Sequence, residues 1–247
     1  MPRYRVTIEY DGTDLVGWQR QTNGPSVQQY IEEAIARFCG EDIRIQGAGR
    51  TDAGVHAYGQ VASFDLTDRH EPRTVKNAVN HHLGSSRISI LDCEEVSEDF
   101  NARFSATGRS YIYRIINRQA RLALDAGYAW HVKRELDHKA MQHGAEILIG
   151  KHDFSSFRAA ACQAKSPIKT LSKLDVVRSG DVIECHVSAP SFLHNQVRAM
   201  VGTLSLVGTG QWNVDDVRSA LAARDRQKAG PNAPPWGLYL SSVSYDS

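Results

Sequence analysis

The stretch IRIQGAGRTDAGVHAYGQVASFDL, residues 43–66, carries a glycine-rich loop between two predicted strands. Residues 43–46 form a short extended segment that leads into the loop, and residues 60–66 resume as a second one. The loop therefore connects one strand to the next. The elements on either side of it indicate the fold class.

These surrounding elements follow one another in the order β-α-β-β-α-β. Residues 3–10 alternate apolar and polar side chains like a half-buried strand. Ser26 matches the first position of a helix capping box, and the apolar helical stripe that follows ends at Gly40. A second helix is predicted over residues 75–83 and a strand over residues 87–91. This order is the split ferredoxin-like pattern, so we predict an α+β fold.

The second half of the chain repeats this theme. Its predicted elements are a strand over 109–117, a helix over 136–148, a hairpin over 174–187, a long helix over 192–206, a helix capped by Asn213 and a last strand over 238–245. We expect two ferredoxin-like halves, residues 1–106 and 107–247. Their sheets should be mixed and mainly antiparallel, with helices packed on one face and an active-site cleft between the halves.

Composition and charge narrow the class of protein. A chain of 247 residues buries a substantial core without disulfides, and its four cysteines include no C-x-x-C pair. The net charge of +1 argues against a protein that only binds nucleic acid. Residues 103–134 nevertheless hold seven basic residues against Asp125 alone, interleaved with aromatic side chains. This region fits RNA phosphates and bases as well as it fits an ordinary solvated face.

Targeting and metal-binding patterns are missing from the sequence. No basic segment followed by an apolar stretch opens the chain, and no run of 18 apolar residues occurs, so we expect a cytoplasmic protein that spans no membrane. The histidines and cysteines make no spacing typical of a metal site, so no metal is expected.

The glycine-rich loop does not match the common phosphate-binding loops. The third glycine of a dinucleotide loop would fall at residue 52, where Asp52 would repel pyrophosphate, and the Lys-Ser/Thr ending of a P-loop is absent. The glycines let the backbone approach a ligand while the loop offers Arg50, Thr51, Asp52 and His56. Taken alone, these residues favour a turn in which Asp52 supplies the bend over a catalytic role for Asp52.

Residues 49–57, GRTDAGVHA, closely resemble the signature of the tRNA pseudouridine synthase A family. Further blocks that resemble the family occur in the same order, namely Gly17–Gln21, Arg109–Tyr113, His152–Phe154, Phe192–Arg198 and Gly237–Leu240. Together the similar blocks and predicted elements span residues 3–245. One departure is Val16, where the family often has an aromatic residue, and we expect it to alter only local packing.

The resemblance implies a pseudouridine synthase fold and an activity. The implied reaction is the isomerisation of uridine to pseudouridine at positions 38, 39 and 40 of the tRNA anticodon stem-loop. It implies a homodimer that needs no cofactor and no metal, with tRNA as its partner. In this family the uracil leaves its ribose, turns, and reattaches through carbon 5.

The resemblance also implies roles for four residues. Asp52 would be the nucleophile, since an ionised carboxylate can attack either the sugar or C6 of uracil. Tyr111 would stack on or beside the target uracil and could assist proton removal at C5. Arg198 would pair with the Asp52 carboxylate. Arg50 would fill the space left by the flipped base or hold its phosphate.

Alternatives remain open for these residues and for the whole chain. Tyr111 also fits a core strand tyrosine, Arg198 also fits a phosphate contact or an exposed position, and His56 fits a structural hydrogen bond better than acid-base work. For the chain, the alternatives are a non-catalytic RNA-binding module and a nucleotide-dependent oxidoreductase. The second is weakened by the missing third glycine.

Overall fold

The computed structural model describes residues 1–160 and 162–246. Its contacts divide the chain into two compact units. Unit 1 contains Met1–Thr107 together with the C-terminal residues from Tyr239, and unit 2 contains Gly108–Leu238. The predicted α+β class, with mixed and mainly antiparallel strand pairing, is confirmed.

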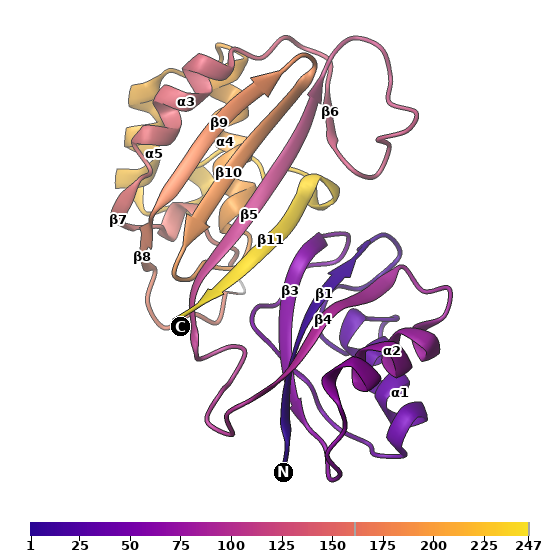
Figure 1. Cartoon of the computed structure of the whole chain (residues 1–247). Coiled ribbons are helices and arrows are strands. Elements are labelled where there is room, and N and C mark those ends of the chain that lie inside the picture. Colours follow the sequence, from indigo (N-terminus) through magenta and orange to yellow (C-terminus); the bar gives the residue numbers. More distant parts are fainter. Residues whose placement is uncertain (161, 247) are drawn as a thin grey trace. The chain divides into compact units, whose positions relative to one another are not determined.

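Unit 1 combines a sheet with two helices. Its elements are β1 (Arg3–Tyr10), α1 (Val27–Cys39), β2 (Gln46–Gly47), β3 (His56–Asp65), α2 (Pro72–Leu83), β4 (Ile88–Val96) and β11 (Leu238–Tyr245). The strands lie in the order β4-β1-β3-β11, and β2 pairs with β3. β1 is antiparallel to both β3 and β4, whereas β11 runs parallel to β3. Helices α1 and α2 cover one face of this sheet (Figure 1).

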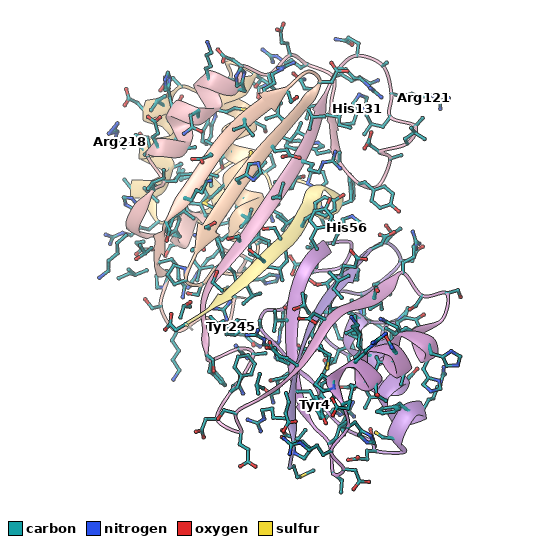
Figure 2. The ribbon with its side chains drawn as sticks, viewed as in Figure 1. Tyr4, His56, Arg121, His131, Arg218 and Tyr245 are labelled. Carbon is teal, nitrogen blue, oxygen red and sulfur yellow. The ribbon has the colours of Figure 1, made fainter. Side chains whose placement is uncertain are left out.

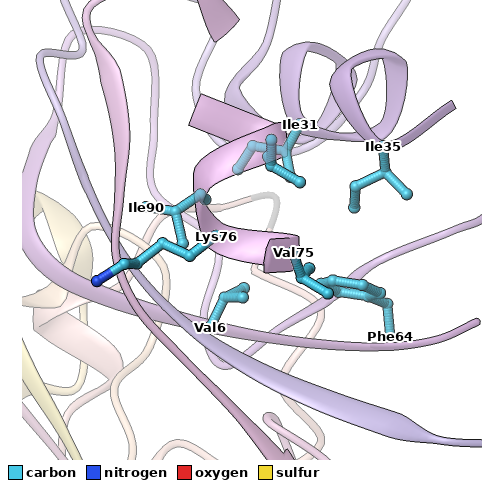
Figure 3. A pocket seen from close by; sticks show the side chains of 8 residues that line it. Val6, Ile31, Ile35, Phe64, Val75, Lys76 and Ile90 are labelled. Carbon is cyan, nitrogen blue, oxygen red and sulfur yellow. The ribbon is translucent and has the colours of Figure 1, made fainter. Parts of the chain in front are cut away.

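The core of unit 1 lies between these two helices and the sheet. Alternate residues of β1 are buried, as its period-2 pattern predicts. Figure 3 shows part of the core, where side chains from β1, α1, β3, α2 and β4 point toward one another: Val6, Ile31, Ile35, Phe64, Val75 and Ile90. Complete burial of one such side chain stabilises the fold by roughly 1.5–3 kcal/mol.

The local signals around α1 are confirmed, whereas the strand that follows it differs. The Ser26 hydroxyl accepts from the Gln29 N–H at 3.2 Å, and Gly40 ends the helix with a left-handed φ of 78°. The short strand predicted around residues 43–46 is present but begins later, because β2 contains only Gln46 and Gly47. The buried Glu32 carboxylate accepts from the Ile45 N–H at 3.2 Å, so a side chain replaces the strand partner.

Unit 2 also has helices on one side of its sheet (Figure 1). Its elements are β5 (Ala106–Asn117), β6 (Trp130–Val132), α3 (His138–Glu146), β7 (Gly150–Asp153), β8 (Ile168–Leu171), β9 (Lys173–Ser179), β10 (Val182–Ala189), α4 (Gln196–Gly208) and α5 (Val214–Ala223). The main sheet has the order β5-β10-β9, with antiparallel pairs, and β6 runs parallel to β5. The β9–β10 hairpin and the Asn213 cap of α5 confirm the sequence prediction. The exposed loop between β5 and β6 carries Arg121 (Figure 2).

Helix α4 begins four residues later than predicted. The sequence predicts a helix from residue 192, but Asn195 adopts a left-handed backbone with φ of 64°, and the helix starts at Gln196. His194 and Asn195 therefore lie before the helix. A left-handed asparagine does not change the spacing of the apolar residues around it, so the pattern could not predict that the helix begins after Asn195.

Two further results concern the residues that the structure describes. None of their helices has the length and apolar character that crossing a membrane requires. In the same part of the chain, no three His, Cys, Asp or Glu side chains group in a way that could hold a metal ion.

Candidate active-site loop

The loop between β2 and β3 is held to unit 1 at its glycine-rich start. The Ala48 N–H donates to the Val61 carbonyl at 2.8 Å. The Gln60 side chain, which is completely buried, donates from Nε2 to the Gly49 carbonyl at 2.8 Å. A buried amide needs such partners, since leaving it unpaired costs about 1–3 kcal/mol. Gln60 therefore holds the start of the loop in place through this hydrogen bond, and the sequence did not predict that role.

Thr51 anchors the middle of the loop to the segment before α1 and to β1. The Tyr10 hydroxyl lies 2.7 Å from Thr51 Oγ1, and the Trp18 N–H donates to the Thr51 carbonyl at 3.1 Å. Gly17 makes this approach possible. A Cβ at Gly17 would lie 2.4 Å from the Thr51 oxygen, and its φ of 104° suits only glycine. The resemblance of the Gly17–Gln21 block thus has a physical basis in the loop contact.

Asp52 follows Thr51 directly and begins a tight turn. The Val55 N–H donates to the Asp52 carbonyl at 3.1 Å, and Gly54 has a φ of 75°. Its side chain is half-buried, whereas the neighbouring Arg50 is exposed. The two interpretations of Asp52 from the sequence are therefore compatible, because its backbone makes the turn while its carboxylate remains partly accessible.

His56 ends the loop as the first residue of β3 (Figure 2). The Gly12 N–H donates to His56 Nδ1 at 3.0 Å. Asp11 Oδ1 lies 3.1 Å from the same nitrogen, and the other Asp11 oxygen pairs with Arg87 at 2.6 Å. The His56 ring also stacks on Tyr239 at 4.8 Å. This geometry fits the structural hydrogen bond expected of His56.

In unit 2, Tyr111 and Tyr113 share one face of β5 but differ in exposure. Tyr113 is completely buried, donates its hydroxyl hydrogen to the Pro234 carbonyl at 2.8 Å, and has its pKa raised by burial. The Tyr111 ring is half-buried and packs edge-on against Phe192, with centroids 5.1 Å apart. The core role that the sequence left open for Tyr111 is thus performed by Tyr113.

Arg198 lies in the first turn of α4 and is half-buried. Its Nε donates to the Ala233 carbonyl at 2.8 Å, and its Nη1 donates to Asn195 Oδ1 at 3.0 Å. These two acceptors therefore orient the guanidinium. The sequence gave no sign of the Ala233 carbonyl as a partner, because Ala233 is distant along the chain.

The predicted site residues fall in both units. Asp52 and Arg50 belong to unit 1, and Tyr111 and Arg198 belong to unit 2. The expectation that their side chains meet stays a prediction. Val16, the departure from the family pattern, packs its side chain against Gly24, where a Cβ would lie 2.6 Å from Val16 Cγ1.

Comparison with known proteins adds an independent line of evidence. A family model described as tRNA pseudouridine synthase matches residues 6–105 and 145–246, which include the Asp52 loop and Arg198 but not Tyr111. A protein of Sinorhizobium fredii named tRNA pseudouridine synthase A is 56% identical over 247 residues, covering 99% of this chain and 100% of its own. Proteins of the same name from Rhizobium leguminosarum bv. trifolii and Brucella ovis are 57% and 56% identical, each over 99% of this chain and over 92% and 98% of their own.

Among solved structures, a chain of a Cbf5–Nop10–Gar1 complex covers 96% of this chain and 47% of its own, at 12% identity and a TM-score of 0.36. A likeness this distant supports no argument about function.

Proposed function

The chain belongs to the tRNA pseudouridine synthase family, and we propose that it isomerises uridine to pseudouridine in tRNA with Asp52 as the nucleophile. The family match covers most of the chain, and the relatives that share more than half of its residues bear the name of this activity. The finer part of the proposal is that the targets are positions 38, 39 and 40 of the anticodon stem-loop, and that the enzyme acts as a homodimer.

The reaction is balanced within one nucleotide. The C1′–N1 glycosidic bond breaks, the uracil turns and a C1′–C5 bond forms. C5 loses its hydrogen as a proton, and N1 gains a proton. The difficult step needs either a nucleophile for C1′ or a nucleophile for C6 of uracil. A carboxylate supplies both options, because a covalent intermediate divides one difficult step into two easier ones. Asp52 is the carboxylate of the family-like run.

The observation that carries the proposal is the immobilised loop. The carbonyl oxygens of Thr51 and Asp52 both accept backbone hydrogen bonds, and the Thr51 side chain is bound by Tyr10. The backbone that bears the half-buried Asp52 carboxylate is therefore fixed before any substrate arrives. Such preorganisation is what a nucleophile requires, since reacting atoms must approach to about 3–3.5 Å in the correct orientation.

The other three residues have assigned roles in the same proposal. Tyr111 offers a partly accessible ring for stacking on the target uracil, and its hydroxyl is the group that would move the C5 proton. Arg198 presents an oriented guanidinium to the Asp52 carboxylate. Arg50, which is exposed beside Asp52, contacts the flipped nucleotide and offsets part of the few kcal/mol that extrusion of a base costs.

The test compares Asp52→Asn with the wild type on unmodified tRNA transcripts. We expect the variant to bind tRNA nearly as well as the wild type and to form no pseudouridine. Asp68→Asn, which changes an exposed aspartate of the same unit, is the matched control and should keep full activity. Product formation by Asp52→Asn would overturn the assignment.

Transcripts that carry a single uridine at position 38, 39 or 40 test the target positions. Product from each of these transcripts, and none from a transcript without uridine there, is the expected result. The rival interpretation, a non-catalytic RNA-binding module, predicts binding of every transcript without product from any. Sedimentation of the protein alone and with tRNA tests the homodimer, and a monomer under both conditions would contradict it.

A further inference from the structure

A strap of chain, residues 229–238, is fixed against helix α4 within unit 2. The Gly230 N–H donates to Thr203 Oγ1 at 2.9 Å. The strap passes so close to the helix that a Cβ at Gly202 would lie 1.8 Å from the Pro231 carbonyl oxygen. No side chain larger than hydrogen fits there, so Gly202 lets the strap rest directly on the helix backbone.

The same strap is bound to Arg198 and to the core of the unit. Arg198 and Ala233 exchange two hydrogen bonds, from Nε to the Ala233 carbonyl at 2.8 Å and from the Ala233 N–H to the Arg198 carbonyl at 2.9 Å. The carbonyl of Pro234 accepts from the buried Tyr113 hydroxyl at 2.8 Å. Gly237 packs on the Tyr113 ring, where a Cβ would lie 2.8 Å from Cζ. The strap is therefore rigid on both sides of residues 235–236.

Trp236 lies between these fixed positions of the strap and yet remains 42% exposed. It occupies the short 3₁₀ turn Pro235–Gly237, between a residue with a fixed φ and a glycine held against Tyr113. The strap contacts on either side hold the backbone that bears the indole. A large aromatic ring that is exposed on a rigid backbone loses little conformational entropy when a partner stacks on it.

The charges that precede the strap indicate the kind of partner. Residues 224–228 carry Arg224, Arg226 and Lys228 against Asp225 alone. Arg226 binds the strap, since it donates to the Gly230 carbonyl at 2.8 Å and to Asn232 Oδ1 at 3.0 Å. Arg224 is paired with Asp153 at 3.5 Å, which leaves Arg226 and Lys228 as the cations that precede the strap. An exposed ring on a strap that a basic segment precedes fits single-stranded RNA, whose bases stack on aromatic side chains while its phosphates contact cations.

We propose that Trp236 stacks on an unpaired base of the RNA substrate, on the same strap that orients Arg198. This inference rests on the proposed function and specifies how its substrate is held. One contact then serves two purposes. The strap contacts that orient the Arg198 guanidinium also hold the backbone that bears Trp236, so a base stacked on the indole would place the RNA at a defined position relative to Arg198.

The test uses full-length protein and an unmodified tRNA transcript. Trp236→Leu keeps an apolar side chain without a ring, whereas Trp236→Phe keeps a ring. We expect Leu to weaken the Kd by about 5- to 150-fold, the range measured for loss of one base–aromatic stack, and Phe to weaken it by less than about fivefold. Tyr30→Ala, which removes an aromatic ring that is 37% exposed on α1, is the matched control and should leave the Kd unchanged.

Tryptophan fluorescence gives a readout that a merely structural role would not change. RNA should quench the emission of the wild type, and this quenching should be largely lost in Trp236→Phe. An unchanged Kd in Trp236→Leu, or full quenching in Trp236→Phe, would overturn the proposal. Wild-type protein that binds tRNA through Trp236 but forms no pseudouridine would overturn the proposed function alone. Wild-type protein that binds no tRNA would overturn both.

Discussion

Replacing Tyr10 with phenylalanine should loosen the loop that carries Asp52. The Tyr10 hydroxyl and Thr51 Oγ1 are 2.7 Å apart, and the two residues are only 4% and 8% exposed. Removing the phenol oxygen deprives the Thr51 hydroxyl of this hydrogen-bond partner at a site that is largely inaccessible to water. Loss of one partner of a buried polar group costs about 1–3 kcal/mol, so we expect the free energy of unfolding to fall by that amount.

Activity should fall for a different reason. Thr51 adjoins Asp52, and a nucleophile displaced by about 1 Å loses up to roughly 100-fold in rate. We therefore expect Tyr10→Phe to lower kcat and to leave the KM for tRNA nearly unchanged. Tyr4→Phe is the matched control. It makes the same chemical change in the same strand and removes a hydrogen bond to the His70 carbonyl at 2.8 Å, but that bond lies away from the loop.

Urea unfolding and steady-state turnover of Tyr10→Phe, Thr51→Val and the double variant complete the experiment. Because the two hydroxyls are partners, the double variant should cost less than the sum of the single changes, by about 0.5 kcal/mol or more. The control should lose stability and keep its kcat. Stability effects that add within about 0.3–0.5 kcal/mol, together with a kcat no lower than that of Tyr4→Phe, would refute the reasoning.

Two other changes probe the strap and the surface. Gly202→Ala should displace the strap from α4, because the new Cβ would lie 1.8 Å from the Pro231 oxygen. The free energy of unfolding should fall by more than the roughly 0.5–3 kcal/mol that ordinary substitutions cost. A thermal midpoint equal to that of the wild type would contradict this expectation. Arg3 lowers the pKa of the Asp65 carboxyl through a bidentate pair, with Nε–Oδ1 and Nη2–Oδ2 distances of 2.7 and 2.8 Å. This pair therefore stabilises the fold above the ordinary pKa of 3.8, and the stabilisation is lost as the pH falls through the lowered pKa. Asp65→Asn should therefore be less stable than the wild type at pH 7, by under about 1 kcal/mol since the pair is partly exposed. In an acid unfolding series this difference should shrink as the pH falls below 3.8, and a difference that stays constant would contradict the reasoning.

Several elements of the fold could be predicted from the sequence because their signals are local. The period-2 pattern of residues 3–10 forms β1, and Ser26 and Gly40 begin and end α1 as expected. The last strand, Leu238–Tyr245, has the predicted bounds. In each case a residue's neighbours in the chain supply the periodicity or the cap, so no distant contact is needed to locate the element.

The starts of β2 and α4 were mispredicted because a tertiary contact or an uncommon backbone conformation determines them. Glu32 binds the Ile45 N–H from the neighbouring helix and shortens β2. Asn195 takes a left-handed conformation and delays α4 until Gln196. Periodicity is insensitive to both effects, since neither changes the spacing of the apolar side chains.

For the Asp52 loop, the sequence by itself determined the residue types and, through resemblance, the family. It did not determine what holds the loop in place. Tyr10, Trp18 and Gln60 reach Thr51 and Gly49 from three separate segments, and only the folded chain brings these segments together. A hydrogen bond requires two groups within about 3 Å in the correct orientation, and that condition depends on tertiary packing and leaves no periodic trace in the sequence.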